Sequence, residues 1–439
     1  MQKPKILLAT IGSLGDLHPF IAIPLALQRR GFHPVIAVSE DHVAKCRAAG
    51  LKTISIMPNI ETALAYTGLS ADDIMKRLIA DPNFLLENLA FPPLAATAAM
   101  LDEAAAGAVA IVGSMLTLAA PIIAEKHGIP FIAAVLQPMA LFSAFDPPQT
   151  PDFFRIMKDG PTSALGIGWN RFIYRILCRE LRRRYAPRID AVRATHGLAP
   201  SNTAILLDPG NPPALTLGCY SAAFAPAPPD APVPTALVGF PMFDSGSGLP
   251  ETLDDELAAF LNAGPPPLVF TLGSAIVHAA GNFYVHAAQA AARLGTRAVL
   301  LTGQPDGEMR SSRDVLVRAY ATHSGLFPRA AVIIHHGGVG TTGQALRAGR
   351  PQLVVPHMTD QFDNARRIQR LGVGESLVAK RFTPDRAQAK LFRLLEHKEY
   401  QTQAARIGAI VQTETGAQTA AFAIKEAIAR HGGLREIGS

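Results

Sequence analysis

Residues 332–365 read VIIHHGGVGTTGQALRAGRPQLVVPHMTDQFDNA, and the order of apolar, glycine and polar residues in this stretch decides the fold. Residues 331–334 form a short apolar run that predicts a buried strand. Two histidines, a glycine-rich turn and a helical segment opening at Thr341 follow, and a second apolar strand is expected at 352–355. Strands that alternate with helices in this way predict a parallel sheet.

The glycine-rich turn has the chemistry of a phosphate site. Backbone N–H groups at the start of a helix lack intrahelical partners, and glycines let a ligand approach them. The second strand leads into a polar stretch, expected to be a loop, that carries Asp360, Gln361 and Asn364. Polar groups beyond the carboxyl end of a neighbouring parallel strand are placed to contact the group attached to that phosphate. The stretch therefore predicts a site for a sugar diphosphate.

The first half of the chain repeats the pattern, with a strand at 6–10, a glycine turn at 12–15 and a helix near 19–30. A proline-rich segment at 224–234 (FAPAPPDAPVP) has the composition of a linker. We therefore expect an α/β fold with two doubly wound, Rossmann-like domains that face each other across a cleft. The expected divisions are a first domain at 1–223, a linker at 224–262, a second domain at 263–410, and a C-terminal helix at 411–439 that packs back toward the first domain.

Composition narrows the class of protein. The chain has 439 residues, of which 17% are charged and about half apolar, so disorder is excluded. The net charge is +6, but Lys and Arg are spread along the chain, and we expect no nucleic-acid partner. The densest basic run, 179–188, reads as a helix with one solvated face, and contact with anionic lipid is the alternative.

The chain is expected to be cytoplasmic, with peripheral contact at the inner face of the membrane left open. Its three cysteines fit no metal-ligand spacing and read as thiols in a reducing compartment. The N-terminal MQKPKILLATIGSLGD reads as a first strand and not as a signal peptide. Residues 104–124 carry no charge, but they parse as strand, turn and helix of a buried unit more readily than as a membrane span.

Residues 338–343 formally fit the GxGxxG pattern of nicotinamide and flavin enzymes, with Asp360 at about the expected distance. Two features count against that interpretation. Paired histidines precede the turn, where a dinucleotide fold keeps space for pyrophosphate, and Asp360 belongs to a longer polar segment.

Several motifs, in order, resemble those of nucleotide-sugar-dependent glycosyltransferases with the GT-B fold. HHGGVGTT, GRPQLVVP and DQFDNA resemble the donor-binding signature, and GSLGDLHPF resembles the acceptor-side loop of the sterol and glycopeptide branches. Within this superfamily the chain is most similar to the bacterial rhamnosyltransferases that build mono-rhamnolipids, through AEKHGIPF, GFPMFD, LDDELAAFL and PLVFTLGS. The similarity runs from Lys5 to about Ala427.

This resemblance implies how the donor is held. His335 would bind the donor diphosphate together with the turn and helix start, whereas His336 would be structural. Ser274 would line the phosphate side, and Asp360 and Gln361 would bind sugar hydroxyls. The remaining implied donor ligands are Gly337, Gly338, Gly340, Thr341 and Thr342.

Two departures from the family pattern leave the nucleotide open. Plant relatives stack uracil on a tryptophan, which this chain lacks near the site, so Tyr320 or adjoining backbone would take that role. The plant glutamate that binds ribose is replaced by Gly343. Either a dTDP- or a UDP-sugar donor is compatible with these residues, and no cofactor is expected.

Asp16 falls where relatives place their catalytic base, and His18 is the rival. A carboxylate there would accept the acceptor's proton as its oxygen attacks the anomeric carbon with inversion. The alternative role for Asp16 is that of a helix N-cap. Where histidine-type relatives carry an orienting aspartate, this chain has Ser114, which favours Asp16 acting without a dyad partner.

Segments 59–101 and 146–188 are rich in aromatic residues and are the expected walls of an acceptor pocket, with ordinary core packing as the alternative. The candidate acceptor residues are Phe84, Phe142, Phe145 and Trp169. Asp254 and Asp255 read as a helix start and not as a metal site.

The expected activity is transfer of a hexosyl group, with rhamnosyl a candidate, to a hydroxyl of an apolar or lipid-like acceptor. A UDP-glucose-dependent glucosyltransferase of sterols, polyketides or phenolics is the alternative. A non-catalytic nucleotide-sugar-binding helper protein is a further one.

Overall fold

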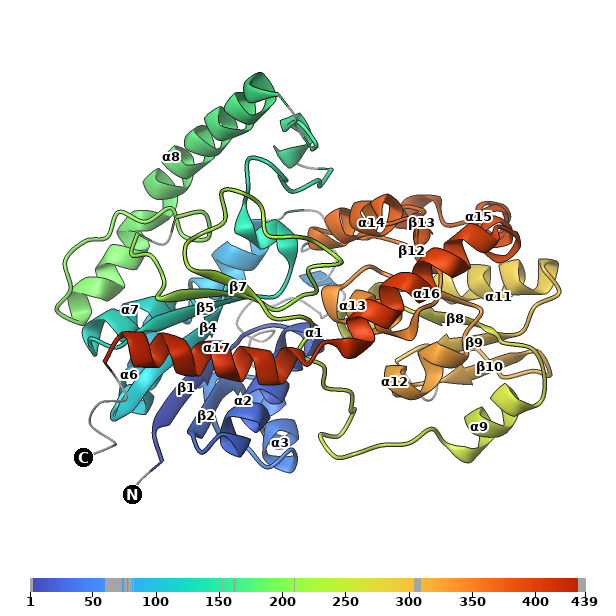
Figure 1. Cartoon of the computed structure of the whole chain (residues 1–439), viewed down its shortest axis with the longest axis horizontal. Coiled ribbons are helices and arrows are strands. Elements are labelled where there is room, and N and C mark those ends of the chain that lie inside the picture. Colours follow the sequence, from blue (N-terminus) through green and yellow to red (C-terminus); the bar gives the residue numbers. More distant parts are fainter. Residues whose placement is uncertain are drawn as a thin grey trace. The chain divides into compact units, whose positions relative to one another are not determined.

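The computed structural model describes residues 3–59, 73, 74, 77, 81, 83–151, 153–160, 163–208, 210–303 and 309–432. The chain divides into two compact units. The first comprises Met1–Leu69, Asp81–Phe243 and Thr415–Ser439, and the second comprises Ser70–Ala80 and Asp244–Glu414. Each unit contains one parallel sheet with its own helices (Figure 1). The expectation of two doubly wound α/β domains is confirmed.

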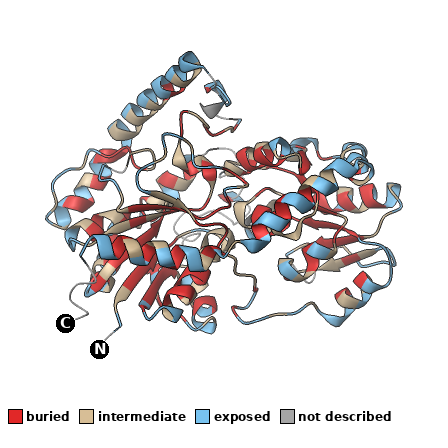
Figure 2. Ribbon diagram, in the orientation of Figure 1, coloured by how far each residue is buried: buried red, intermediate tan, exposed pale blue. Residues whose placement is uncertain are grey.

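The sheet of the first unit has the strand order β3-β2-β1-β4-β5-β6-β7, and each neighbouring pair is parallel. Its strands are β1 (Lys5–Ala9), β2 (His33–Ser39), β3 (Lys52–Met57), β4 (Ala108–Ser114), β5 (Phe131–Val135), β6 (Leu215–Gly218) and β7 (Thr235–Leu237). The central strands are buried along their length, as Figure 2 shows. A parallel sheet covered on both faces requires such continuous apolar runs.

Helices complete the first unit. They are α1 (Leu14–Leu17), α2 (Pro19–Arg29), α3 (Glu40–Ala48), α6 (Leu94–Ala105), α7 (Ala119–Lys126), α8 (Ala164–Thr195) and α17 (Gly416–Arg430), with the short η1 (Leu85–Ala90), η2 (Pro138–Leu141) and η3 (Phe153–Ile156). The uncharged segment 104–124 folds as β4 followed by the start of α7. The C-terminal α17 packs against α2. Residues 224–262, expected as a linker, contain β7 of this sheet and a helix of the second unit.

The sheet of the second unit has the order β10-β9-β8-β11-β12-β13, again parallel throughout. Its strands are β8 (Leu268–Thr271), β9 (Ala298–Leu301), β10 (Val315–Arg318), β11 (Val332–His335), β12 (Gln352–Val354) and β13 (Gly374–Ser376). Its helices are α9 (Asp255–Asn262), α10 (Gly273–Ile276), α11 (Phe283–Arg293), α12 (His323–Leu326), α13 (Val339–Ala348), α14 (Asp360–Arg370), α15 (Pro384–Glu396) and α16 (Lys398–Thr413), with η4 (Val277–Ala279), η5 (Phe327–Arg329) and η6 (Ala379–Arg381).

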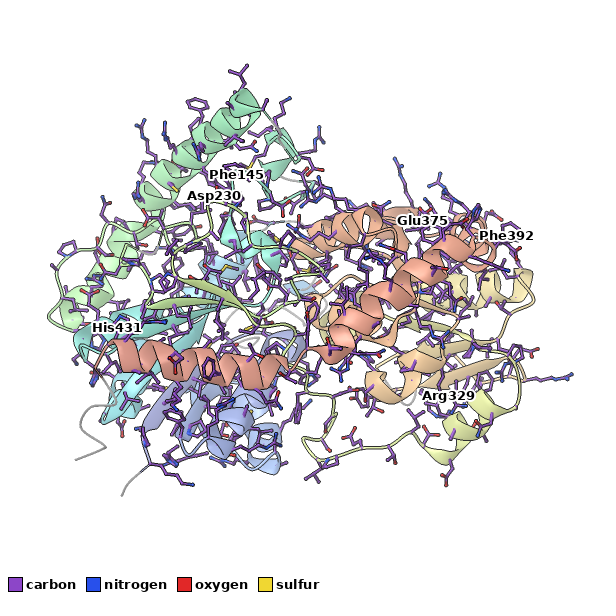
Figure 3. All side chains as sticks on the ribbon, viewed as in Figure 1. Phe145, Asp230, Arg329, Glu375, Phe392 and His431 are labelled. Carbon is purple, nitrogen blue, oxygen red and sulfur yellow. The ribbon has the colours of Figure 1, made fainter. Side chains whose placement is uncertain are left out.

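Charged side chains in the second unit cap a helix and form hydrogen bonds at an edge of the sheet. Asp254 caps α9, accepting a hydrogen bond from the Leu257 N–H at 2.8 Å, so the expected helix start is confirmed. Glu375, on the edge strand β13, accepts from Lys390 Nζ at 2.7 Å and from the Tyr400 hydroxyl at 2.8 Å (Figure 3). No helix in the described ranges combines the length and the apolarity needed to cross a membrane.

Candidate functional site

The candidate donor site lies at the carboxyl edge of the second sheet. Strands β8, β11 and β12 are neighbours there, and each continues into a loop at that edge. Gly273 begins α10 just after β8, the loop after β11 carries His336 and two glycines, and the loop after β12 leads into α14. The parallel pairing therefore brings three separate segments of sequence to one place, as the sequence predicts.

His335 is the last residue of β11, and its side chain is enclosed by the protein. Its side chain is fully buried, its Nε2 donates to Gln352 Oε1 at 2.9 Å, and its Nδ1 accepts from the Gly337 N–H at 3.1 Å. Burial lowers the pKa of this imidazole to about 4, so it is neutral, with its proton on Nε2. Both ring nitrogens are thus engaged within the protein, and the expected contact of His335 with a diphosphate stays a prediction.

His336 lies in the loop after β11, close to Gly273 and Gly338. A Cβ added to Gly273 would lie 2.5 Å from His336 Cε1, and one added to Gly338 would lie 2.3 Å from His336 Nε2. The imidazole is thus enclosed by two glycine backbones, which is the reason that glycine is needed at both places. Its Nδ1 is buried without a hydrogen-bond partner. Burial holds its pKa well below the ordinary value, so the ring is neutral.

The start of α13 presents the phosphate-binding groups. Gly338 is the N-cap, and Gly340 and Thr341 follow in the first turn. The Thr342 hydroxyl is fully buried and donates to the Gly338 carbonyl at 3.0 Å, so this hydroxyl is used within the helix. The backbone N–H groups of the first turn remain the groups suited to an anion.

Asp360 and Gln361 open α14, where the sequence predicts a loop. Gln361 Oε1 accepts from the His357 and Met358 N–H groups at 2.9 and 3.2 Å, and these bonds tie the loop before the helix to its first turn. Thr359, just before the helix, has φ of 37°, an uncommon backbone conformation for a β-branched residue. The tight turn at Thr359 allows the polar segment to begin a helix at Asp360.

Asn364 connects the two helix starts. Its Nδ2 donates to the Gly337 carbonyl at 2.9 Å and to Asp360 Oδ2 at 3.2 Å. Gly337 has φ of +93°, and a Cβ there would lie 2.7 Å from Val354 Cγ1. Asn364 therefore fixes the glycine-rich turn and Asp360 relative to each other.

Two further predicted donor residues lie in the same unit, one in a short helix and one in a loop. Ser274 is exposed, one residue after Gly273 in the short α10. Tyr320 follows β10, its ring packs 3.1 Å from the place of a Cβ on Gly246, and its hydroxyl donates to Asp244 Oδ1 at 3.4 Å. Burial, with Asp244 nearby, raises the pKa of Tyr320.

In the first unit, Asp16 is the third residue of α1, and Ser13, not Asp16, is the N-cap. Asp16 Oδ2 accepts from the Ser13 N–H at 2.9 Å and from the Ser13 hydroxyl at 3.3 Å. A Cβ on Gly12 would lie 2.3 Å from the same oxygen. Burial raises the pKa of Asp16, and the hydrogen bonds from Ser13 partly offset that rise.

The rival base and the residue that replaces the orienting aspartate lie nearby in the fold. His18 stands between α1 and α2, with its Nε2 3.1 Å from Lys45 Nζ and its ring 5.5 Å from the ring of Phe243. Ser114 ends β4, the neighbour of β1, and its hydroxyl is buried without a partner. No carboxylate stands at Ser114 to orient a histidine.

An apolar cavity of about 350 Å³ lies beside the carboxyl ends of β4 and β5, and it is the candidate acceptor pocket. Ser114, Met115 and Phe142 are among its lining residues, with α7 and α8 contributing others. Of the four predicted acceptor residues, only Phe142 lines it.

The other three predicted acceptor residues lie elsewhere. Phe84 is buried at the start of η1, and Phe145 stacks under the Arg171 guanidinium, 5.7 Å from its ring centroid (Figure 3). Trp169 lies on α8, 43% exposed, with its Nε1 donating to the Ile156 carbonyl at 2.9 Å.

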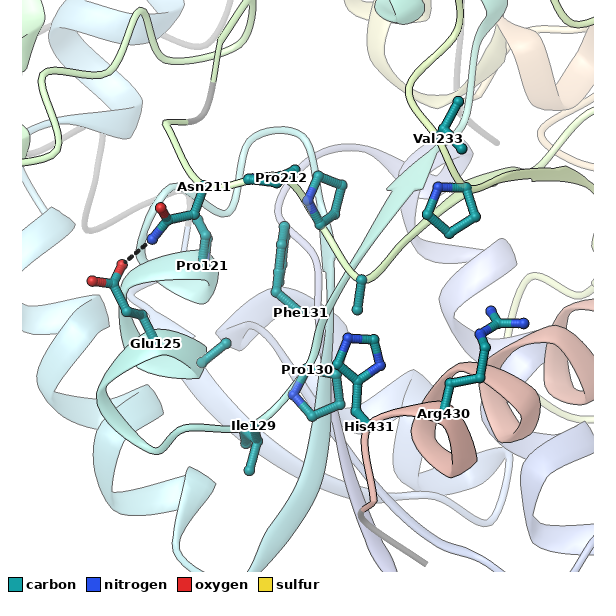
Figure 4. Close-up of a pocket in the computed structure, with 14 residues that line it drawn as sticks. Pro121, Glu125, Ile129, Pro130, Phe131, Asn211, Pro212, Val233, Arg430 and His431 are labelled. Atoms are coloured by element: carbon teal, nitrogen blue, oxygen red, sulfur yellow. Dashed lines mark hydrogen bonds between the residues drawn. The ribbon is translucent and has the colours of Figure 1, made fainter.

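A second hollow in this unit has a different setting. It lies around the amino end of β5, with Phe131, Pro212 and Val233 on its walls and His431 at its rim (Figure 4). Asn211 Nδ2 donates there to Glu125 Oε2 at 2.6 Å. It contains none of the predicted site residues.

Sequence reasoning did not include His336 and Gly273 among the candidate donor residues, although the fold brings them together at this edge. The sequence held a signal for His336, because it directly precedes Gly337 and Gly338 and so lies beyond the end of the strand. No local signal identifies Gly273, since its partner His336 is far away along the chain.

The chain is similar in sequence to known glycosyltransferases. Residues 312–420 match the family described as Erythromycin biosynthesis protein CIII-like, C-terminal domain. Vancomycin aglycone glucosyltransferase of Amycolatopsis orientalis is 30% identical over 437 residues, covering 97% of this chain and 98% of the relative. O-mycaminosyltylonolide 6-deoxyallosyltransferase of Streptomyces fradiae is 28% identical over 432 residues, covering 96% and 97%.

Solved structures agree in fold. The glycosyltransferase VinC in complex with dTDP superimposes with a TM-score of 0.67 at 21% identity, covering 97% of this chain and 100% of that one. The spinosyn forosaminyltransferase SpnP gives a TM-score of 0.68 at 17% identity, with the same coverage.

Proposed function

Because this chain belongs to the macrolide- and glycopeptide-type family of nucleotide-sugar glycosyltransferases with the GT-B fold, we propose that it moves a hexosyl group from a dTDP- or UDP-sugar to a hydroxyl of an apolar acceptor, with inversion. The observation that carries the donor half is the neutral His336 enclosed by Gly273 and Gly338 at the start of α13. An unpartnered ring nitrogen and free helix N–H groups at one place suit a diphosphate.

On this proposal the second unit stabilises the leaving group. The positive end of α13 and a hydrogen bond from His336 offset the charge that grows on the diphosphate as the glycosidic bond breaks. His335 lies behind these groups, where it accepts a hydrogen bond from the Gly337 N–H and donates one to Gln352. Asp360, fixed by Asn364, binds a sugar hydroxyl. No metal ion or further cofactor is part of the proposal.

Asp16 is the proposed base. Its carboxylate takes the proton of the acceptor hydroxyl while that oxygen forms a bond to the anomeric carbon, and the bond to the diphosphate oxygen breaks on the opposite face. The nucleoside diphosphate leaves with the electron pair. A raised pKa makes the carboxylate a stronger base than an exposed one.

The sugar and the acceptor are the finer parts of the proposal. The apolar lining of the cavity beside β4 and β5 supports an apolar acceptor. The relatives are named for a 6-deoxyallosyl and a glucosyl transfer, and VinC was solved with dTDP. Rhamnosyl transfer to a lipid-like acceptor stays a prediction, with glucosyl transfer from UDP-glucose to a ring-system acceptor as its rival.

Calorimetric titration of the full chain with dTDP, UDP, dTDP-rhamnose and UDP-glucose tests the donor. Tighter binding of the dTDP pair supports a deoxysugar donor, and tighter binding of the UDP pair supports the glucosyl rival. If none of the four binds, the proposed donor site is wrong. The configuration of the product's anomeric centre, measured by proton NMR, tests inversion.

A further inference from the structure

The N-terminal half of α8 exposes large apolar side chains along one line. Four residues follow one another at intervals of four, three and four positions, which places them on one face of a helix. They are Leu165, Trp169, Phe172 and Ile176, exposed by 88%, 43%, 51% and 47%. This set, called the α8 stripe below, is unusual for a surface helix, which normally turns such a face to the core.

The opposite face of the same helix segment is firmly held. Asn170 is fully buried, and its Nδ2 donates to the Ala144 and Lys158 carbonyls, both at 2.9 Å. Ile173 is also buried, and the Tyr174 hydroxyl donates to the Ser143 carbonyl at 3.3 Å. The stripe therefore faces outward because its helix is anchored on the other side. Figure 1 shows this end of α8 reaching beyond the other elements of its unit.

The charges around the stripe are positive and unpaired. Residues 164–179 contain Arg171, Arg175 and Arg179 but no acidic residue. Among the described residues, neither Arg175 nor Arg179 forms an ion pair. Further along α8 the arginines are paired: Arg184 and Arg188, for example, bind Glu87 at 2.8 and 2.6 Å. The free cations are thus concentrated where the apolar side chains are exposed.

We propose that the N-terminal half of α8 docks on the surface of an anionic lipid bilayer. The stripe enters the interfacial layer, where tryptophan and phenylalanine are favoured, and Arg175 and Arg179 contact headgroup phosphates. A second copy of this chain is a poorer occupant. Symmetric pairing of two α8 stripes would bring the same unpaired arginines together without acidic partners.

Trp169 is the one tryptophan of the chain, so it reports directly on the stripe. We expect its fluorescence to shift to shorter wavelength when the full chain is mixed with vesicles containing about one-third phosphatidylglycerol, but not with pure phosphatidylcholine vesicles. Flotation of the same mixtures measures the bound fraction. Binding to the anionic vesicles should weaken as salt is added.

Variants distinguish binding through the α8 stripe from non-specific adsorption to vesicles. The double substitution Phe172→Ser with Ile176→Ser, and separately Arg175→Glu with Arg179→Glu, should each weaken vesicle binding by about tenfold or more. Phe392→Ser is the matched control, because Phe392 is 54% exposed on α15 of the other unit (Figure 3). Donor binding by calorimetry should be unchanged in all of them, which distinguishes this proposal from the donor site.

Two results would overturn the proposal. One is the absence of both a fluorescence shift and flotation with anionic vesicles at saturating lipid. The other is a stable dimer in sedimentation analysis that dissociates on Phe172→Ser with Ile176→Ser, which would assign the stripe to a second copy of the chain.

Discussion

The two units each place a glycine turn between a central buried strand and a helix, yet different anions suit the two turns. After β11, the Gly338 N-cap leaves the first-turn N–H groups of α13 open, and a ligand can fill the place. After β1, the carboxylate of Asp16 itself accepts the Ser13 N–H, beside Gly12. On the proposed function, the turn after β11 would hold a substrate phosphate, whereas the turn after β1 holds the protein's own carboxylate.

The largest expected effect comes from removing the charge of that carboxylate. Asp16→Asn keeps an oxygen that can accept the Ser13 N–H, so α1 should stay folded, but it removes the base. We expect kcat to fall by about a thousandfold, with donor affinity unchanged by calorimetry. His18→Ala is the comparison and should lose far less. Turnover of the Asp16→Asn enzyme within about tenfold of wild type would contradict the role of Asp16 as base.

The second-largest expected effect distinguishes the roles of His335 and His336. His336→Ala should lower kcat/KM by about a hundredfold and weaken donor binding while leaving the unfolding free energy nearly unchanged. His335→Ala should lower the free energy of unfolding by about 3 kcal/mol, because it opens a cavity and leaves Gln352 without its partner. Steady-state kinetics and urea unfolding measured on both variants check this, and an exchange of the two phenotypes would restore His335 as the donor ligand.

A fall in pH should lower the folding stability contributed by the buried histidines and raise the stability contributed by Asp16. Burial lowers the pKa of His335 to about 4, and those of His336, His323 and His357 also lie below the ordinary value. In the unfolded chain histidines take up protons below about pH 6.5, so the folded state loses stability as the pH falls from there. His335 alone contributes about 3 kcal/mol of this loss between pH 6.5 and 4. The raised pKa of Asp16 acts the other way, since its protonation favours the folded state.

Urea unfolding followed by circular dichroism at about pH 7.5 and about pH 5 measures this dependence. The variant His335→Asn should have a flatter pH dependence than wild type, whereas His33→Asn, at an exposed position, should not. Equal slopes in the three proteins would contradict the neutral, buried state of His335.

The smallest expected effect concerns the acceptor pocket. Met115 is half-buried on the wall of the cavity beside β4, so Met115→Trp should narrow it without disturbing the core. We expect KM for an apolar acceptor to rise by about threefold to tenfold, with donor affinity unchanged. A matching rise in the donor dissociation constant would show that the cavity does not belong to the acceptor.

The fold was predictable because its signals are local. Apolar runs of strand length, each followed by glycine and a helical pattern, predict the parallel sheets, and β1, β11 and β12 start and end within about one residue of the predicted runs. The polar stretch from Asp360 was expected as a loop and folds as the start of α14. Its start involves hydrogen bonds from the preceding loop to Gln361 and the uncommon conformation of Thr359, and neither is visible in a pattern of residue types.

The sequence by itself determined the two α/β domains, the position of the glycine-rich turn after β11 and the glycosyltransferase family, because backbone preferences and motif order are properties of consecutive residues. The tertiary structure alone decided which side chains face the site. His335 is turned inward by Gln352, seventeen positions later, while His336 fits against Gly273. Trp169, expected in an acceptor pocket, instead joins the outward stripe because Asn170 anchors the other face of α8. The direction of a side chain depends on partners that the chain brings near only when it folds.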